Sequence, residues 1–350
     1  IVQQTILTKK IDFKTQAKVS LLTTILAGIV GIIMAFKGYG VWALVVQQVG
    51  SSIARVIALW YLSSWRPKAQ WSSESFRYLW NYGCKLLASG VLDTIYNNIY
   101  PIVIGKYYSA CSLGVYTRAQ HFADLPSMNV TGVLQRVTFP VLSSIQNEEE
   151  RLARSYRQLL RLSAFVVFPL MAMLAGIAEP MIKILLGEQW IETVLLLQII
   201  CFAKILYPIH AINLNLLQVK GRSDLFLRLE IIKKIIGISI MVYTIPRGLV
   251  MMALGLVVSS FLCLIINTYY SGRLIRVGYI IQMKDIMPTM IICLSMSAMM
   301  LILNKIIPNI YCQFIVSGLL GFLFYIVAAR LFLKEQFDYL LSLVKNKKSN

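Results

Sequence analysis

The chain has 350 residues, of which 58% are hydrophobic and 14% are charged, and its formal net charge is +19. Ordinary soluble domains contain about 45–50% apolar and about 25% charged residues, so this composition excludes a water-soluble fold. A basic excess of this size would suit a nucleic-acid-binding protein. Here, however, the basic residues stand between long apolar runs, which indicates a membrane protein with no nucleic-acid partner.

Ten segments are long and apolar enough to cross a bilayer, since a spanning helix needs about 20 mainly apolar residues. In chain order they cover residues 19–37, 39–62, 82–105, 115–145, 159–178, 192–218, 225–246, 250–271, 286–306 and 310–333. The fourth is overlong and contains Pro126, so we expect a kink or an interfacial first turn there. The predicted fold is all-α, a polytopic transmembrane helical bundle.

The connections between these segments alternate in charge. One set, which includes both chain ends, holds 22 of the 34 Lys and Arg residues. The other set holds only six, namely Lys37, Lys106, Arg118, Lys183, Arg247 and Lys305. Because cytoplasmic loops carry the excess of Lys and Arg, we expect both ends of the chain in the cytoplasm. Residues 148–157 form an amphipathic stretch, expected to anchor at the membrane surface, and the basic end after Arg330 should face anionic lipid.

The cysteines and histidines show no metal-binding or disulfide pattern. Six cysteines are scattered without a CxxC pair, and the two histidines, His121 and His210, have no Cys, Asp or Glu at metal-ligand spacing. We therefore predict no disulfide, no metal site and no cofactor.

A weak internal repeat appears at an offset of 210 residues, where Lys37 aligns with Arg247 and Gly38 with Gly248. Composition bias is the alternative explanation. A duplicated bundle of the same orientation is typical of transporters. The duplication predicts two six-helix lobes plus two extra helices. It also predicts that residues 3–62 and 213–272 superpose. It also predicts about 130 further residues before Ile1.

The repeat and the loop charges divide the chain into predicted parts. They are the last helices of an N-terminal lobe (1–62), a cytoplasmic interlobe linker (63–81), a C-terminal six-helix lobe (82–272), two extra transmembrane helices (286–333) and a basic cytoplasmic tail (334–350).

Four stretches carry a family resemblance. They are Gln3–Lys18 followed by Lys37–Val45, Ser89–Asn98, Ile102–Lys106 with Leu113–Ala119, and Leu185–Trp190. They resemble the polysaccharide-export branch of the multidrug/oligosaccharidyl-lipid/polysaccharide flippase superfamily, the Wzx-type flippases of lipid-linked oligosaccharides. The resemblance implies a transporter, not an enzyme, in the bacterial plasma membrane. It implies two lobes around a central cavity that opens alternately to either side. The implied substrate is a polyprenyl diphosphate that carries an oligosaccharide, and the implied partners are a polysaccharide polymerase and glycosyltransferases of the same pathway.

Such a substrate requires buried cations and polar groups. Six basic residues lie within the predicted spans, namely Arg55, Lys85, Arg136, Lys204, Lys233 and Lys234. An ionisable group at membrane depth costs about 2.5–3.5 kcal/mol on insertion scales, so each needs water or a partner. Lys204 lies about 18 Å into its span, at 1.5 Å per residue, and Asp93 lies at similar depth from the opposite side.

With the family substrate in view, we predict that Lys204 and Arg118 attract the diphosphate. Asp93 and Asn97, which share a helix face, would contact sugar or a coupling cation. The alternative is that Asp93 and Lys204 simply pair across the bundle.

Further polar residues are candidates for the same cavity. Arg55 and Arg136 are candidate substrate contacts, although both lie within snorkelling reach of the membrane surface. Asp124 and Glu230 join Asp93 as candidates for ion coupling. Glu230 is also spaced to pair with Lys233 and Lys234 on its own helix, which would neutralise it. Tyr207, Asn215 and Gln218 follow Lys204 on roughly one helix face and predict a polar stripe toward the cavity.

Three other functions fit parts of this pattern. A cation-coupled antiporter of the multidrug (MATE) type would share the fold. A membrane enzyme of polysaccharide assembly should show a catalytic cluster in a sizeable outer loop, whereas the outer loops here are short. A scaffold without transport activity is the third.

The loop charges predict the membrane topology directly. A single cysteine introduced beside Arg154 or Arg222 should react with an impermeant thiol reagent only from the cytoplasm, and one beside Lys183 only from outside. Labelling of both sets from the same side of intact cells would refute the orientation.

Overall fold

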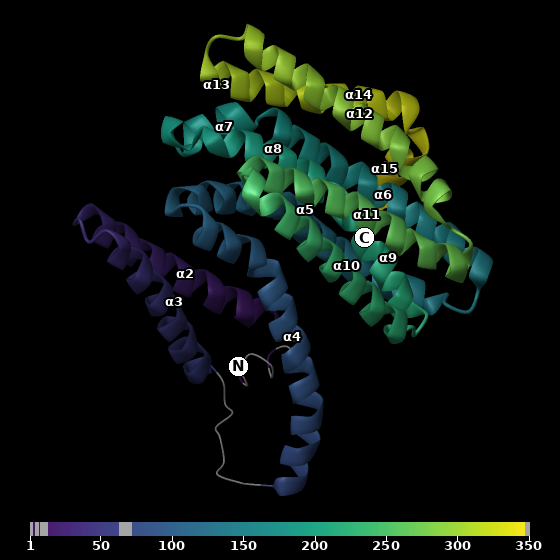
Figure 1. Ribbon diagram of the computed structural model, residues 1–350, viewed down its shortest axis with the longest axis horizontal. Coiled ribbons are helices and arrows are strands. Elements are labelled where there is room, and N and C mark those ends of the chain that lie inside the picture. The colour runs from purple at the N-terminus through teal and green to yellow at the C-terminus, as the bar shows by residue number, and fades with distance from the viewer. Residues whose placement is uncertain (1–2, 4–6, 8–12, 63–71, 347–350) are drawn as a thin grey trace. The chain divides into compact units, whose positions relative to one another are not determined.

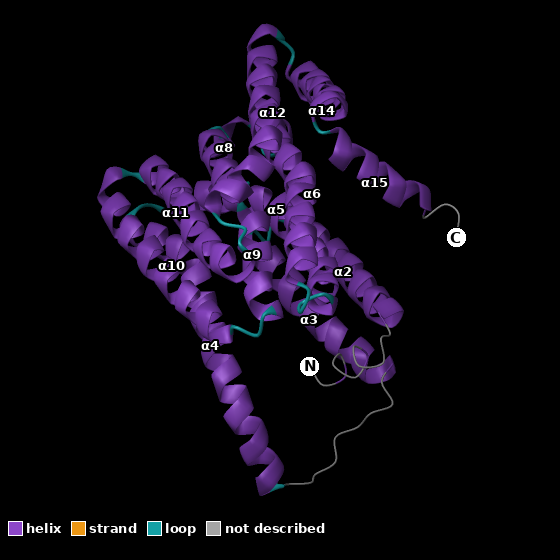
Figure 2. Ribbon diagram, turned by 90° about the vertical axis from the view of Figure 1, so that its right-hand side faces the viewer, coloured by secondary structure: helices purple, strands orange, loops and turns teal. Residues whose placement is uncertain are grey.

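The computed structural model of the chain describes residues 3, 7, 13–62 and 72–346, and their regular structure is entirely helical (Figures 1 and 2). The predicted all-α class is confirmed. The elements are α2 (Phe13–Phe36), α3 (Val41–Leu62), α4 (Ser73–Tyr107), α5 (Ala110–Ser144), α6 (Glu149–Gly176), α7 (Ala178–Leu185), η1 (Glu188–Trp190), α8 (Glu192–Lys204), α9 (Tyr207–Val219), α10 (Ser223–Thr244), η2 (Ile245–Arg247), α11 (Leu249–Ile275), α12 (Tyr279–Ile306), α13 (Ile310–Cys312), η3 (Gln313–Ser317), α14 (Gly318–Phe332) and α15 (Lys334–Asn346).

Within the described residues, seven helical segments are long and apolar enough to cross a membrane. They are Thr15–Phe36, Val41–Leu62, Glu149–Gly176, Glu192–Val219, Leu249–Ile275, Tyr279–Ile306 and Ile310–Phe332. The chain is therefore a multi-pass membrane protein. The other three predicted spans also form long helices, α4, α5 and α10, but these are more polar than the seven.

Several predicted boundaries are wrong in an instructive way. Helix α4 begins at Ser73, nine residues before the predicted span, so residues 73–81 of the predicted linker are helical. Helix α6 begins at Glu149 and includes the amphipathic stretch that precedes the predicted span at residue 159. Hydropathy marks where a helix meets lipid, whereas the backbone hydrogen bonds continue through the polar residues beyond it. The predicted span 192–218 is two helices, interrupted at Ile205 and Leu206. Pro208 has no N–H to donate to the carbonyl of Lys204, which explains the interruption.

The chain forms two compact units, residues 1–86 and 87–350. Residues 63–71 of the predicted linker lie outside the described residues, and the assignment of lobes stays a prediction. Each unit contains a helical hairpin, α2–α3 in the first and α10–α11 in the second. Helices α2 and α10 start 210 residues apart, at Phe13 and Ser223.

The turns of these two hairpins hold the aligned glycines. Gly38 has φ of 79° and Gly248 has φ of 99°, a conformation that glycine adopts without the strain of a side chain. The two hairpins thus share helix starts and turn geometry at the predicted offset. Their superposition stays a prediction.

Helix α6 is central to the second unit, where it packs against α5, α8, α9 and α12. Its side chains Tyr156, Leu160 and Phe168 are fully buried. Hydrogen bonds between buried polar side chains join helices in this core. The amide of Asn213 donates to Gln282 at 3.0 Å, which joins α9 to α12, and the hydroxyl of Ser271 on α11 donates to the same Asn213.

At the corner between α11 and α12, Gly272 should not tolerate a larger side chain. A Cβ on Gly272 would lie 3.0 Å from the backbone Cα of Gly278, so Gly272→Ala should force the two backbones apart. We expect a loss of about 1–3 kcal/mol, as for other overpacked sites, measured as a lower thermal midpoint in detergent. Gly132→Ala is the control, because no atom lies within 4 Å of its added Cβ. Equal midpoints for the two variants would contradict the close contact.

Candidate functional site

A polar cavity of about 390 Å³ opens within the second unit, between α4, α5 and α8–α11. Its polar lining residues are Tyr96, Gln135, Lys204, Tyr207, His210, Glu230, Lys233, Lys234, Ser259 and Ser260. The lining contains three lysines and one glutamate, so it carries a formal excess of two positive charges. A cluster of this kind at membrane depth is a candidate functional site.

The three long helices that are less apolar than the rest all contribute to the cavity. Tyr96 comes from α4, Gln135 from α5, and the Glu230, Lys233 and Lys234 cluster from α10. These are the three predicted spans that fall outside the apolar seven. Water or a polar ligand in the cavity can solvate these five side chains.

Lys204 is the last residue of α8 and lies immediately before the interruption of the helix. Its ammonium group donates to the carboxylate of Asp124 on α5 and forms an ion pair with it. The two side chains are 22% and 25% exposed, so the pair is only partly shielded from solvent. The predicted pair of Lys204 with Asp93 stays a prediction, because the Asp93 side chain lies outside the described part of the structure.

On α10 the predicted neutralising pair is present, because Lys233 donates to Glu230 at 2.5 Å. Lys234, the next residue, lies 5.7 Å from the ring centroid of Tyr96, within the range of a cation–π contact. Tyr96 therefore lies in the cavity beside a cation.

His210 is held by two neighbours on α11. Its Nε2 lies 3.2 Å from the hydroxyl of Ser260, and its Nδ1 lies 3.1 Å from the amide nitrogen of Asn267. In a neutral imidazole one ring nitrogen donates a hydrogen bond and the other accepts one, and the tautomer decides which nitrogen does which. The imidazole is thereby fixed in the cavity wall.

The predicted polar stripe after Lys204 is partly wrong. Tyr207 lines the cavity, but Asn215 is buried behind the lining, where it accepts from Gln135 at 3.4 Å and donates to the hydroxyl of Thr138 at 3.3 Å. Gln218 is not part of the lining, and Ala211 and Leu214 take that face instead. The stripe assumed one uninterrupted helix from residue 192 to 218, and the break at Ile205 changes the faces that follow.

Arg118 does not line this cavity. Its side chain is exposed and its guanidinium lies 5.9 Å from the ring centroid of Trp190. Trp190 also packs against Gly114, with ring atoms 3.8 Å from where a Cβ would stand. Two of the stretches that carry the family resemblance, Leu113–Ala119 and Leu185–Trp190, thus meet in the fold.

The remaining predicted site residues divide into two groups. Arg55 is exposed on α3 in the first unit. The side chains of Asp93, Asn97 and Arg136 lie outside the described part of the structure, although their backbones belong to α4 and α5. Their proposed contacts stay predictions.

The sequence reasoning missed Gln135, His210, Ser259 and Ser260. The only available signal was their polarity within apolar segments. Ser and Gln occur often enough in membrane helices that polarity alone does not single them out.

Comparison with known proteins places the chain in a family. Residues 1–195, more than half of the chain, match the family of polysaccharide biosynthesis proteins. The chain belongs to this family. The predicted resemblance to the polysaccharide-export branch is confirmed.

Curated relatives agree with this assignment. The teichuronic acid biosynthesis protein TuaB of Bacillus subtilis is 26% identical over 63% of this chain and 46% of its own length. The lipopolysaccharide biosynthesis protein WzxC of Escherichia coli is 26% identical over 59% of this chain and 42% of its own. The succinoglycan biosynthesis transport protein ExoT of Rhizobium meliloti is 24% identical over 54% and 38%. The chain thus matches less than half the length of each.

A solved structure shares the fold. The lipid II flippase MurJ, in an inward closed conformation, superposes with a TM-score of 0.74 over 91% of this chain and 68% of its own, at 17% identity. At this identity the likeness concerns the fold alone.

Lys204 and Asp124 are 80 positions apart in the sequence. Because they form an ion pair, we predict that the effects of substituting them on stability are not additive. Lys204→Met should lower the amount of protein in the membrane, because it leaves the Asp124 carboxylate without its partner. The double variant with Asp124→Asn should recover most of the loss. We expect a coupling energy on the order of 1–3 kcal/mol, between the values for buried and surface pairs.

The control is the same comparison of single and double variants at another ion pair, Lys183 with Glu179. That pair lies within one short helix at 2.9 Å, with the glutamate 48% exposed, and should couple by less than about 1 kcal/mol. Simple additivity of the Lys204 and Asp124 losses would show that the two charges do not stabilise each other.

Proposed function

We propose that this protein carries a lipid-linked oligosaccharide, attached to a polyprenyl diphosphate, from the inner to the outer leaflet of the bacterial plasma membrane for surface polysaccharide assembly. One observation carries the proposal, the cavity with three lysines inside an otherwise apolar bundle. The family, the names of TuaB, WzxC and ExoT, and the fold shared with a lipid II flippase support it.

The chemistry of the lining suits the two polar parts of such a substrate. A diphosphate is a multiply charged anion, and the low dielectric of the membrane strengthens its attraction to a nearby ammonium group. The three lysines of the lining, Lys204, Lys233 and Lys234, are the proposed contacts, and carboxylates hold two of them, Lys204 by Asp124 and Lys233 by Glu230. Tyr96, Tyr207 and Ser259 offer rings and hydroxyls that can stack on and hydrogen-bond to sugar.

The carboxylates are the proposed coupling groups. Asp124 and Glu230 each hold a lysine, so a proton or cation on either carboxylate would release that lysine toward an anion. Asp93 remains a further coupling candidate, and Asn97, Arg118, Arg55 and Arg136 remain candidate substrate contacts.

The cellular setting belongs to the same proposal. The charge distribution of the loops favours an inner-membrane orientation with both ends of this chain in the cytoplasm. The protein would act as a transporter without catalysis of its own. Its partners would be the membrane lipids and the polymerase and glycosyltransferases that consume and supply the lipid-linked oligosaccharide.

The charge of Lys204 can be tested in cells whose surface polysaccharide depends on this protein. The double variant Lys204→Met with Asp124→Asn removes the cation without leaving an unpaired carboxylate. Because Asp124 is itself a proposed coupling group, the reference is Asp124→Asn alone, and we expect the double variant to export on the order of tenfold less than that reference, the scale of one lost charge-assisted contact. Lys204→Arg should retain more export, because it keeps the charge. Surface polysaccharide is measured relative to protein in the membrane.

Lys305→Met is the matched control, because Lys305 is exposed at the end of α12 and does not line the cavity. Normal export by the double variant at normal abundance would remove Lys204 from the mechanism. Deletion of the gene should leave complete lipid-linked repeat units on the inner leaflet. Incomplete units would instead indicate an enzyme of assembly.

A further inference from the structure

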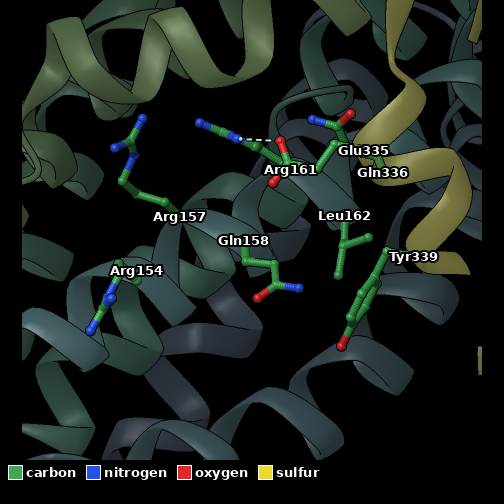
Figure 3. A pocket seen from close by; sticks show the side chains of 8 residues that line it. All are labelled: Arg154, Arg157, Gln158, Arg161, Leu162, Glu335, Gln336 and Tyr339. Carbon is green, nitrogen blue, oxygen red and sulfur yellow. Dashed lines mark hydrogen bonds and ion pairs between the residues drawn. The ribbon is translucent and has the colours of Figure 1, made fainter.

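A second pocket, here called the arginine pocket, shares no lining residue with the cavity. It has a volume of about 350 Å³ and lies between α6 and α15 (Figure 3). Arg154, Arg157 and Arg161 line it from α6, and Glu335, Gln336 and Tyr339 line it from α15. The three arginines are spaced by three and four residues, which places them on one face of the helix.

Two of the three arginines are already oriented by a buried carboxylate. Arg157 donates to Asp285 of α12 through Nε at 2.7 Å and Nη2 at 2.8 Å, and Arg161 donates to the same carboxylate at 2.6 Å. The Asp285 side chain is 2% exposed. One negative charge therefore fixes two guanidinium groups without neutralising both.

The rest of the pocket has spare positive charge. Glu335 reaches Arg161 at 3.3 Å from α15, but its side chain is 82% exposed, so it is a loosely held neighbour. Figure 3 shows this contact joining the two helices. Arg154 makes no hydrogen bond or ion pair with the described residues. Three arginines against Asp285 and Glu335 leave one net positive charge.

The position of the pocket points to the membrane surface. Helices α6 and α12 begin near it, and α14 ends at Phe332 immediately before α15. Leu331 and Phe332 are 69% and 75% exposed, as expected of side chains in contact with lipid tails. The loop charges assign this end of the unit to the cytoplasmic side, where the leaflet carries anionic lipid.

We propose that the arginine pocket binds the phosphate group of an anionic phospholipid from the cytoplasmic leaflet. Guanidinium forks match the oxygens of a phosphate. Arg154 would be the main contact, Arg157 and Arg161 would add charge, and Tyr339 would pack beside the glycerol. A lipid held there fastens α15 to α6 and α12. This site is separate from the transport cavity and does not depend on the substrate carried.

The test measures lipid retained by the purified protein. Native mass spectrometry of the protein with phosphatidylglycerol or phosphatidylcholine should show preferential retention of phosphatidylglycerol. Arg154→Gln should weaken that retention about tenfold, the scale of a charge-assisted hydrogen bond. Glu335→Gln should strengthen it, because a competing carboxylate is removed.

Arg151→Gln is the matched control, since Arg151 lies on the same helix, pairs with Glu148 and does not line the pocket. It should leave retention unchanged. Equal retention of the two lipids by the wild-type protein, or equal loss in both arginine variants, would overturn the proposal. Inorganic phosphate should not displace the lipid at millimolar concentration. Displacement would assign the pocket to a soluble phosphate instead. Circular dichroism confirms that each variant is folded.

Discussion

A charge inside this bundle is stable only where an opposite charge or water reaches it, and much of the structure follows from that constraint. Lys204 lies against Asp124, Glu230 against Lys233, and Asp285 between Arg157 and Arg161. Two of these contacts join helices that are far apart in the chain, α5 with α8 and α6 with α12. The packing of distant helices therefore has to bring opposite charges together, and each pair in turn stabilises the helix contact in which it lies.

The helices themselves could be predicted from the sequence because the bilayer allows few other structures. Apolar length located every long helix, and the glycines at positions 38 and 248 located two tight turns. The starts of α4 and α6 could not be predicted in this way. Hydropathy reports contact with lipid, whereas a helix ends where its backbone hydrogen bonds end, and the polar residues after Ser73 and Glu149 continue those bonds.

The candidate site was predictable only in part. Lys204 was evident as a basic residue deep in an apolar segment, and Glu230 and Lys233 were evident from their spacing. The partner of Lys204 was not evident, because Asp124 is 80 residues away and only the packing of α5 on α8 brings them together. The positions of Asn215 and Gln218 were wrong because one proline, Pro208, interrupts the helix that was assumed to be continuous.

That interruption also determines how strongly Lys204 can hold an anion. Its ammonium group belongs to the last residue of α8, where the unpaired carbonyls of a helix carry about half a negative charge. Asp124, which forms an ion pair with the ammonium group, opposes much of the lysine's charge. Under the proposed function, an anion that approaches would meet a cation already partly neutralised, so its binding would be weak and readily reversed. A site that must release what it binds benefits from such a lysine more than from one with an unopposed charge.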